Sequence, residues 1–325
     1  MGNTSSNRKR DKDNSQIVPQ ADSNTIPAHL TGNGCSIRAD SDVKIIGGRP
    51  YLDEKVSTYI CPTDWEEADR IQMGHFILKK LLDGSYAANL SDIIKPGSKI
   101  LDIGCGPGHW SFEVAQKFPE AEVYGVDIVS SFPNEIKPSN CYFELCNVLE
   151  GLPFSNDEFD YVFMRHMVSA LKKDQWVPLF SEIMRVLKPG GTVESVEFEW
   201  AAKSMGPVHT QLITKWFEMT SKTRAMDFQF TSKLEQTIKD AGFQNVTCIC
   251  KDVPLGKWDE KLGRVAEIWT ANLAEMANGM KSLSAQIMGI TDEEWMNIIN
   301  TIVQEFDEYR TYHEHRIILA TKKYD

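Results

Sequence analysis

A glycine-rich segment near residue 100 is the part of the sequence best suited to bind a ligand. It runs from Leu101 to Trp110 with the order LDIGCGPGHW, between a predicted buried strand and a predicted helix. Glycine allows a tight turn and a close approach of a ligand to the backbone. Free N–H groups at a helix start favour an anionic or polar group. We therefore expect a binding site built on Gly104, Gly106 and Gly108.

The spacing of these glycines separates two kinds of nucleotide fold. An acidic residue, Asp102, is followed after one residue by Gly-x-Gly-x-Gly. The dinucleotide fingerprint Gly-x-Gly-x-x-Gly would need a glycine at position 109, where the chain has His109. An NAD-type dehydrogenase is therefore the weaker alternative.

Polar residues also follow the next two predicted strands. Asp127 comes 19 residues after Gly108 and ends the apolar segment 123–126. In a parallel sheet, an acid at this place can accept hydrogen bonds from both ribose hydroxyls. Asn147 follows the third strand, and its amide can pair with an adenine edge. The alternative is that Asp127 is a surface residue and Asn147 a turn residue.

Strands and helices alternate around these residues, which predicts a parallel sheet with helices on both faces. A capping-box pattern from Thr63 to Glu66 predicts the start of an earlier helix. The segment Lys188–Gly191 predicts a turn that ends a helix. The predicted strands are 99–103, 122–126, 141–145, 161–164, 192–198, 245–250 and 315–321, and the predicted helices include 110–118, 175–187, 208–220 and 231–241.

The chain divides into three parts by composition. Residues 1–45 are polar and lack apolar periodicity, so we expect a disordered tail. Residues 46–95 are expected to form a helical cap. Residues 96–325 are expected to form the main domain, with helical insertions at 204–225 and 259–310. Two amphipathic helices are expected in the second insertion.

The start of the tail fits an N-myristoylation pattern, with Gly2 exposed after removal of Met1 and a hydroxyl at Ser6. The basic cluster from Arg8 to Lys12 follows, and such a cluster is the usual second anchor for one acyl chain. We therefore expect weak membrane association through this tail. An ordinary polar tail is the alternative.

Net charge and cysteine usage restrict the partners and the compartment. The net charge is −11 and the main body has no basic stripe, which argues against a nucleic-acid substrate. Seven scattered cysteines without a secretory segment predict reduced thiols and a cytoplasmic protein, with a nuclear or membrane-associated fraction as an alternative. No metal-ligand pattern is found, since the Cys248-x-Cys250 pair lacks partner ligands.

The run from Leu101 to Glu197 resembles the core of class I S-adenosylmethionine (SAM) methyltransferases. The matching parts are 102–108, Asp127, Leu152-Pro153-Phe154 with Phe159-Asp160, and 185–191. Residues 49–322 also resemble the fungal LaeA-like methyltransferases, through Arg49-Pro50-Tyr51, 59–70, 108–110, Gly206-Pro207 and 254–258. The resemblance implies a Rossmann-like α/β fold: a seven-stranded, mostly parallel sheet with an antiparallel last strand, helices on both faces and extra helices before that strand.

The resemblance also implies SAM as the cofactor and assigns residues to it. Gly104, Gly106 and Gly108 would accommodate its methionine part, and Asp102 its amino end. Asp127 would hold the ribose. The residues assigned by position to the adenine or to a carboxylate are Ile128, Asn147, Val148 and Arg165.

A catalytic base is needed only where the acceptor must lose a proton early. The candidates are His166, beside Arg165, and Glu197, at the end of the fifth strand; Tyr59 is a further candidate. We expect a methyltransferase that acts on a small molecule. The alternative is a regulatory protein that uses the fold to methylate or bind a protein partner, since LaeA-like proteins are linked to the regulation of secondary metabolism.

Overall fold

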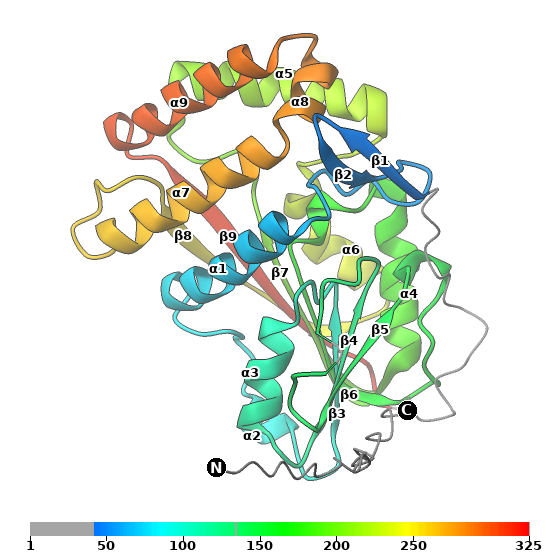
Figure 1. Ribbon diagram of the computed structural model, residues 1–325. Helices are drawn as coiled ribbons and strands as arrows, with labels where there is room; N and C mark the ends of the chain where they lie inside the picture. Colours follow the sequence, from blue (N-terminus) through cyan, green and yellow to red (C-terminus); the bar gives the residue numbers. More distant parts are fainter. Residues whose placement is uncertain (1–41, 134, 325) are drawn as a thin grey trace, which may run out of the picture.

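The computed structural model describes residues 42–133 and 135–324 and is built around one seven-stranded sheet (Figure 1). Its strands have the order β5-β4-β3-β6-β7-β9-β8. Neighbours from β5 to β7 pair in parallel, and β9 pairs antiparallel with both β7 and β8. This confirms the expected fold class. The strands are β3 Lys99–Ile103, β4 Glu122–Asp127, β5 Cys141–Leu145, β6 Phe159–Arg165, β7 Leu187–Phe198, β8 Gln244–Pro254 and β9 Tyr312–Thr321.

The central strands read as continuous apolar runs because helices cover both faces of the sheet. Ile100, Leu101 and Ile103 of β3 are completely buried. Most of the extra helices gather above one end of the sheet, where α5, α8 and α9 pack together and α7 packs against α1 (Figure 1). The helices are α1 Trp65–Leu81, α2 Leu90–Ile93, α3 His109–Lys117, α4 Trp176–Val186, α5 Pro207–Arg224, α6 Leu234–Asp240, α7 Gly263–Gly279, α8 Lys281–Met288 and α9 Asp292–Glu308.

A β-hairpin precedes α1 and corrects two expectations. It consists of β1 Val43–Ile46, which begins inside the expected tail 1–45, and β2 Arg49–Leu52, which lies inside the expected helical cap 46–95. Gly47 and Gly48 have positive φ and form the two-residue turn that suits the twist of an antiparallel pair. The predicted lipidation at Gly2 and the basic cluster Arg8–Lys12 lie outside the described residues.

Three local predictions at element boundaries are wrong. The N-cap of α1 is Asp64 rather than Thr63, and its carboxylate accepts the Glu67 N–H at 3.0 Å. Residues 188–191 lie within β7 rather than in a turn. They form an irregularity in the strand: Leu187 pairs with Phe159 of β6, and the next pair is Thr192 with Tyr161. The second insertion holds three helices, because α8 follows α7 after one residue, Met280.

Gly108 is the N-cap of α3 and has a left-handed φ, and an aromatic ring lies close to its Cα, so we expect a large effect of substitution. A Cβ at Gly108 would lie 2.5 Å from Cζ of Phe143, whose ring is also held against Gly125 and stacked on Phe132. Gly97 has a similar φ with open space around it. We expect Gly108→Ala to lower the free energy of unfolding by about 3 kcal/mol and Gly97→Ala by about 1 kcal/mol.

Urea unfolding measures the loss in the free energy of unfolding for each variant. Both variants share the backbone cost of a left-handed alanine, so the extra loss in Gly108→Ala reports the contact with Phe143. Equal losses in the two variants would contradict the packing role assigned to Gly108.

Candidate functional site

A cavity of about 210 Å³ opens at the carboxyl ends of β3, β4 and β6 and is covered by α1 and α7. The structure brings nearly all of the predicted cofactor residues to its wall; only Gly108 lies outside the lining. The predicted residues that line it are Asp102, Gly104, Gly106, Asp127, Ile128, Asn147, Val148 and Arg165. Ligands of open α/β sheets bind at this edge, so the cavity is the candidate site.

The three glycines of the loop have different surroundings, although all have positive φ. A Cβ at Gly104 would lie 2.6 Å from Sδ of Met167. A Cβ at Gly106 would have only Ile71 of α1 near it, at 3.6 Å, so a side chain there would take up cavity space. Gly108 instead accommodates the Phe143 ring. Gly106 is therefore the glycine whose lack of a side chain matters most to a ligand.

Asp127 ties the glycine loop to the end of β4. Its Oδ2 accepts the Gly106 N–H at 2.8 Å, and its Oδ1 accepts the Val129 N–H at 2.8 Å. An ionised carboxylate has about four acceptor positions, so each oxygen can also accept a hydroxyl. The backbone bonds therefore fix the carboxylate at the cavity wall, at the end of β4.

Asn147 and Val148 lie just after β5. The Asn147 side chain caps the short 3-10 helix Val148–Glu150: its Oδ1 accepts the Leu149 N–H at 3.2 Å and its amide donates to Glu150 at 3.0 Å. This cap matches the turn role considered as the alternative for Asn147. Val148 is buried and offers an apolar surface to the cavity.

Arg165 is a half-buried cation at the end of β6. Its Nη2 lies 3.3 Å from Nδ1 of His75, and its guanidinium lies over the Phe163 ring. None of the carboxylates in the described part of the chain forms an ion pair with it, and burial lowers the pKa of Arg165. Because a buried charge is costly without a counterion, this side chain is suited to bind a carboxylate that enters the cavity.

Asp102 is buried beside this cation and accepts a hydrogen bond from Ser111 Oγ at 2.6 Å. Burial raises its pKa from 3.8 to about 7. The folded protein therefore keeps a proton that the unfolded chain has lost, and this group lowers stability as the pH rises from about 4 to about 7. The same carboxyl ionises readily if a cation binds next to it.

We expect Asp102→Asn to be more stable than the unsubstituted protein by about 2 kcal/mol at pH 8, because an amide has no charge to bury. Near pH 4 the two proteins should unfold at the same urea concentration, since Asp102 is then protonated in the folded state. A stability difference that does not change with pH would refute the assigned ionisation.

Among the base candidates, only His166 and Tyr59 line the cavity. His166 is half-buried with φ of 60°, and burial holds its pKa well below 6.5, so its ring is neutral. Tyr59 donates to Glu67 at 3.0 Å, and burial raises its pKa. Glu197 lies outside the lining, because its carboxylate accepts the N–H groups of Met167 and Val168.

One cluster in the cavity wall was not predicted from the sequence. Arg70 of α1 bonds to Glu67 at 2.8 Å through Nε, and through Nη1 to Asn272 of α7 at 3.2 Å. The Asn272 amide returns a bond to the Arg70 carbonyl at 2.8 Å. The i,i+3 spacing of Glu67 and Arg70 was a readable signal, whereas Asn272 lies about 200 residues away in the sequence.

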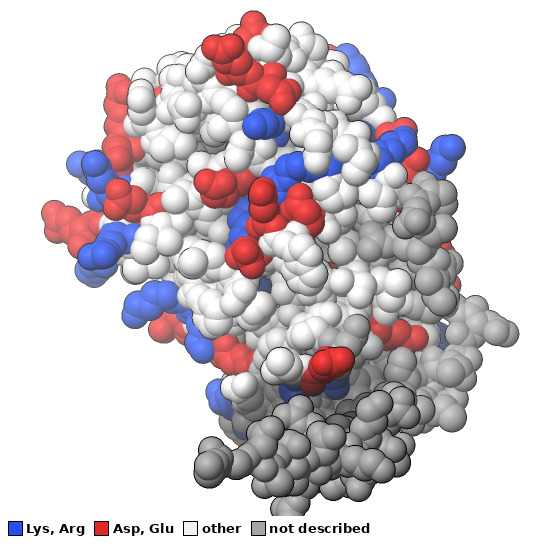
Figure 2. All heavy atoms as spheres, viewed as in Figure 1, with Lys and Arg blue, Asp and Glu red and all other residues white. Residues whose placement is uncertain are grey.

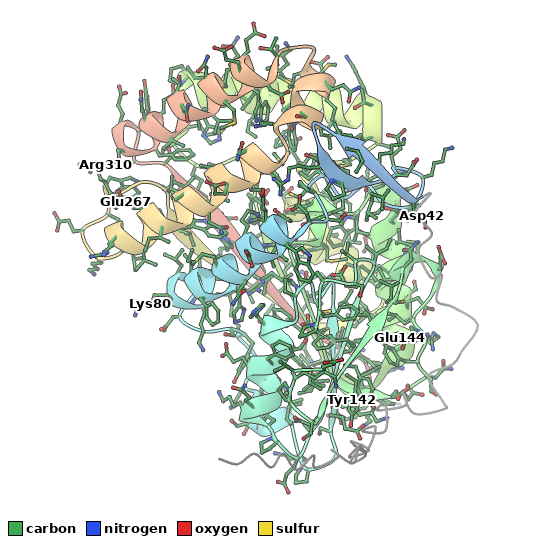
Figure 3. The ribbon with its side chains drawn as sticks, viewed as in Figure 1. Asp42, Lys80, Tyr142, Glu144, Glu267 and Arg310 are labelled. Carbon is green, nitrogen blue, oxygen red and sulfur yellow. The ribbon has the colours of Figure 1, made fainter. Side chains whose placement is uncertain are left out.

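The exposed sides of the two covering helices carry charged side chains alongside apolar ones such as Phe76, and other residues of both helices line the cavity. Lys80 of α1 and Glu267 of α7 are exposed and lie at the left edge of the molecule in Figure 3. Figure 2 shows acidic and basic side chains interspersed on this side, without a broad basic surface.

In residues 42–133 and 135–324, no group of three or more His, Cys, Asp or Glu side chains could hold a metal ion. No helix in the described part of the chain is long and apolar enough to cross a bilayer.

Comparisons with known proteins agree with this geometry. Residues 100–191 match the family model described as a methyltransferase domain. The secondary metabolism regulator laeA of Aspergillus fumisynnematus is 28% identical over 244 residues, which are 72% of this chain and 63% of the relative. The methyltransferase pytC of Aspergillus terreus is 25% identical over 290 residues, which are 85% of this chain and 87% of the relative.

A solved structure is also similar. Phosphoethanolamine N-methyltransferase 2 of Haemonchus contortus, in complex with S-adenosyl-L-methionine, is 20% identical, with a TM-score of 0.48, and the match covers 84% of this chain and 62% of that chain. The chain spans less than two thirds of the length of the laeA relative.

Proposed function

Because the chain contains a class I SAM-dependent methyltransferase domain and resembles the LaeA-like methyltransferases, we propose that it is an enzyme that methylates a small molecule. The observation that carries the proposal is the meeting of three features in one cavity. These are a left-handed glycine with space beside it, a carboxylate fixed at the end of β4, and a half-buried arginine that forms no ion pair with a described carboxylate: Gly106, Asp127 and Arg165.

The cavity wall fits the parts of SAM one by one. Arg165 would hold the carboxylate of the methionine part, and Asp102, once ionised by the neighbouring ammonium, would hold its amino group. Asp127 would accept the ribose hydroxyls. Val148 and Ile128 offer apolar side chains for the adenine ring. Asn147 already uses one Oδ1 lone pair and one amide N–H in its cap bonds to Leu149 and Glu150. Its second lone pair and second N–H would pair with the adenine edge.

When bound, SAM supplies a methyl carbon on a sulfonium: an acceptor lone pair forms the new bond while the carbon–sulfur bond breaks and its electron pair passes to sulfur. The protein positions the partners and excludes water, and the cover formed by α1 and α7 serves this purpose. The neutral ring of His166 can take the proton from an acceptor O–H or N–H, because its Nε2 has no partner among the described residues.

Calorimetric titration with SAM and with NAD tests the cofactor site. We expect SAM to bind and NAD not to bind, and Gly106→Val to abolish SAM binding because the side chain takes up the cavity. Gly97→Val is the matched control, since Gly97 is also left-handed but lies on the surface. Binding of NAD in place of SAM would overturn the proposal.

The acceptor class is tested with SAM that carries a labelled methyl group, incubated with cell extract. We expect the label in low-molecular-mass products that are absent with Gly106→Val. The alternative function, in which the fold methylates or binds a protein partner, predicts label in protein or none at all.

A further inference from the structure

A second cavity of about 100 Å³ lies next to the first and is lined by residues of the extra helices α5, α7 and α9. The two cavities share wall residues Phe198, Leu273 and Met276, so they are neighbouring chambers. Phe198 connects them: its ring lies 5.0 Å from that of His166, which lines the first chamber, and 5.4 Å from that of His313, which lines the second.

The wall of the second chamber is aromatic and uncharged. Trp200 and Trp216 stack there with ring centroids 5.1 Å apart, and Phe306 closes the side formed by α9. No Asp, Glu, Lys or Arg side chain occurs among the described residues that line it. A charged or phosphorylated group would therefore enter without a counterion, at high desolvation cost.

Four side chains in this wall carry a buried ring nitrogen with no hydrogen-bond partner in the described part of the chain. They are Trp200, His209, Trp216 and His313. Each buried polar atom left unpaired costs about 1–3 kcal/mol. Trp295 in the same wall avoids this cost by donating to the Ala277 carbonyl at 3.0 Å.

The unpaired nitrogens have different roles. Both indole N–H groups can only donate, whereas a neutral imidazole offers one donor and one acceptor. Burial lowers the pKa of His209 to about 4 and that of His313 well below 6.5, so both imidazoles are neutral. These nitrogens are covered in the wall as it stands, so an occupant that carries a carbonyl-type acceptor and an N–H or O–H donor pairs with them once their rings turn toward the chamber.

We propose that the second chamber holds the body of the methyl acceptor, an uncharged, ring-containing apolar molecule with polar N or O atoms, while its reacting atom extends past Phe198 toward His166. This inference rests on the proposed methyltransferase function. It assigns the extra helices to acceptor binding.

Binding of indole and indene to the full chain, saturated with S-adenosylhomocysteine (SAH), tests the inference. The two probes have the same shape, but only indole carries an N–H donor, and bound SAH keeps both out of the cofactor site. We expect saturable indole binding by calorimetry and indene binding at least about 5-fold weaker, as one unmade hydrogen bond predicts. Absence of saturable indole binding would overturn the inference.

Ala274→Phe places a ring into the chamber from α7, and Ala271→Phe places the same ring on the exposed side of that helix. We expect the first to weaken indole binding at least about 10-fold and the second to leave it unchanged. His313→Phe should bring indole binding down to the level of indene. If Ala274→Phe does not fold, Val303→Phe fills the chamber from α9 instead.

The outcomes separate the two proposals. Unchanged indole binding in the folded filling variants overturns the acceptor chamber but leaves the cofactor site intact, because SAH titration is measured first and independently. Failure of SAH to bind overturns the proposed function, and the acceptor role falls with it, even where indole binds.

Discussion

Replacement of Arg165 with methionine is expected to weaken binding of SAH at least about 100-fold, the effect of removing one partner of a buried charge pair. Binding of 5′-methylthioadenosine, which shares the nucleoside but lacks the amino-acid part, should change less than about 2-fold, because no carboxylate is there to lose. The ratio of the two losses assigns Arg165 to the carboxylate rather than to general folding of the cavity.

The same variant should unfold at a higher urea concentration than the unsubstituted protein when no ligand is present. Arg165 is half-buried, and in the described part of the chain its side chain hydrogen-bonds to His75 and forms no ion pair, so methionine removes a desolvated charge and keeps the volume. Arg185→Met is the matched control: Arg185 bonds to Glu182 and to the Leu152 and Phe154 carbonyls away from the cavity. It should destabilise the fold and leave SAH binding unchanged. Equal losses of SAH and 5′-methylthioadenosine affinity in Arg165→Met would refute the assignment.

Local sequence patterns predicted the sheet well because its strands are buried on both faces. The apolar run 99–103 matches β3 at both ends, and Cys141–Leu145 matches β5. The hairpin at 43–52 was missed although Gly47-Gly48 between apolar residues is a hairpin signal. The low apolar content of the first 45 residues favoured a disordered tail instead.

Predicted helix boundaries were wrong where a single contact with another element determines the cap residue. Asp64 rather than Thr63 caps α1, because its carboxylate also pairs with Arg49 of β2 at 2.6 and 2.7 Å. No helix rule contains that partner, which comes from another element. The same limit applies to the second cavity: contacts among β7, α5, α7, α9 and β9 bring its wall together, and sequence spacing does not encode them.

The sequence indicated which residues lie at the candidate site more reliably than it indicated their roles. The loop glycines share one motif, yet the structure gives Gly108 to the Phe143 ring and Gly106 to the cavity. Glu197 follows the expected strand pattern, but its carboxylate is bonded to the backbone after His166. A motif thus predicts where a residue lies along the chain, while its surroundings determine whether it can reach a ligand.

Asp127→Ala is expected to remove the preference of the protein for adenosine over 2′-deoxyadenosine, two probes that differ by one hydroxyl. A charge-assisted hydrogen bond to that hydroxyl accounts for a preference of about 10-fold or more in the unsubstituted protein. SAH binding should weaken by about 100-fold, because the variant loses two acceptors for the ribose and also the bond that holds Gly106 N–H.

Loss of affinity alone would not identify the ribose contact, since Asp127→Ala also loosens the loop. The deoxy comparison does, because loosening weakens both probes alike. Asp160→Ala is the matched control: that carboxylate accepts the Lys99 N–H and pairs with Lys188 at the opposite end of the strands. It should keep the preference for adenosine while losing stability. If Asp127→Ala still prefers adenosine as strongly as the unsubstituted protein, another group binds the 2′-hydroxyl, and the nucleoside lies elsewhere than at the end of β4.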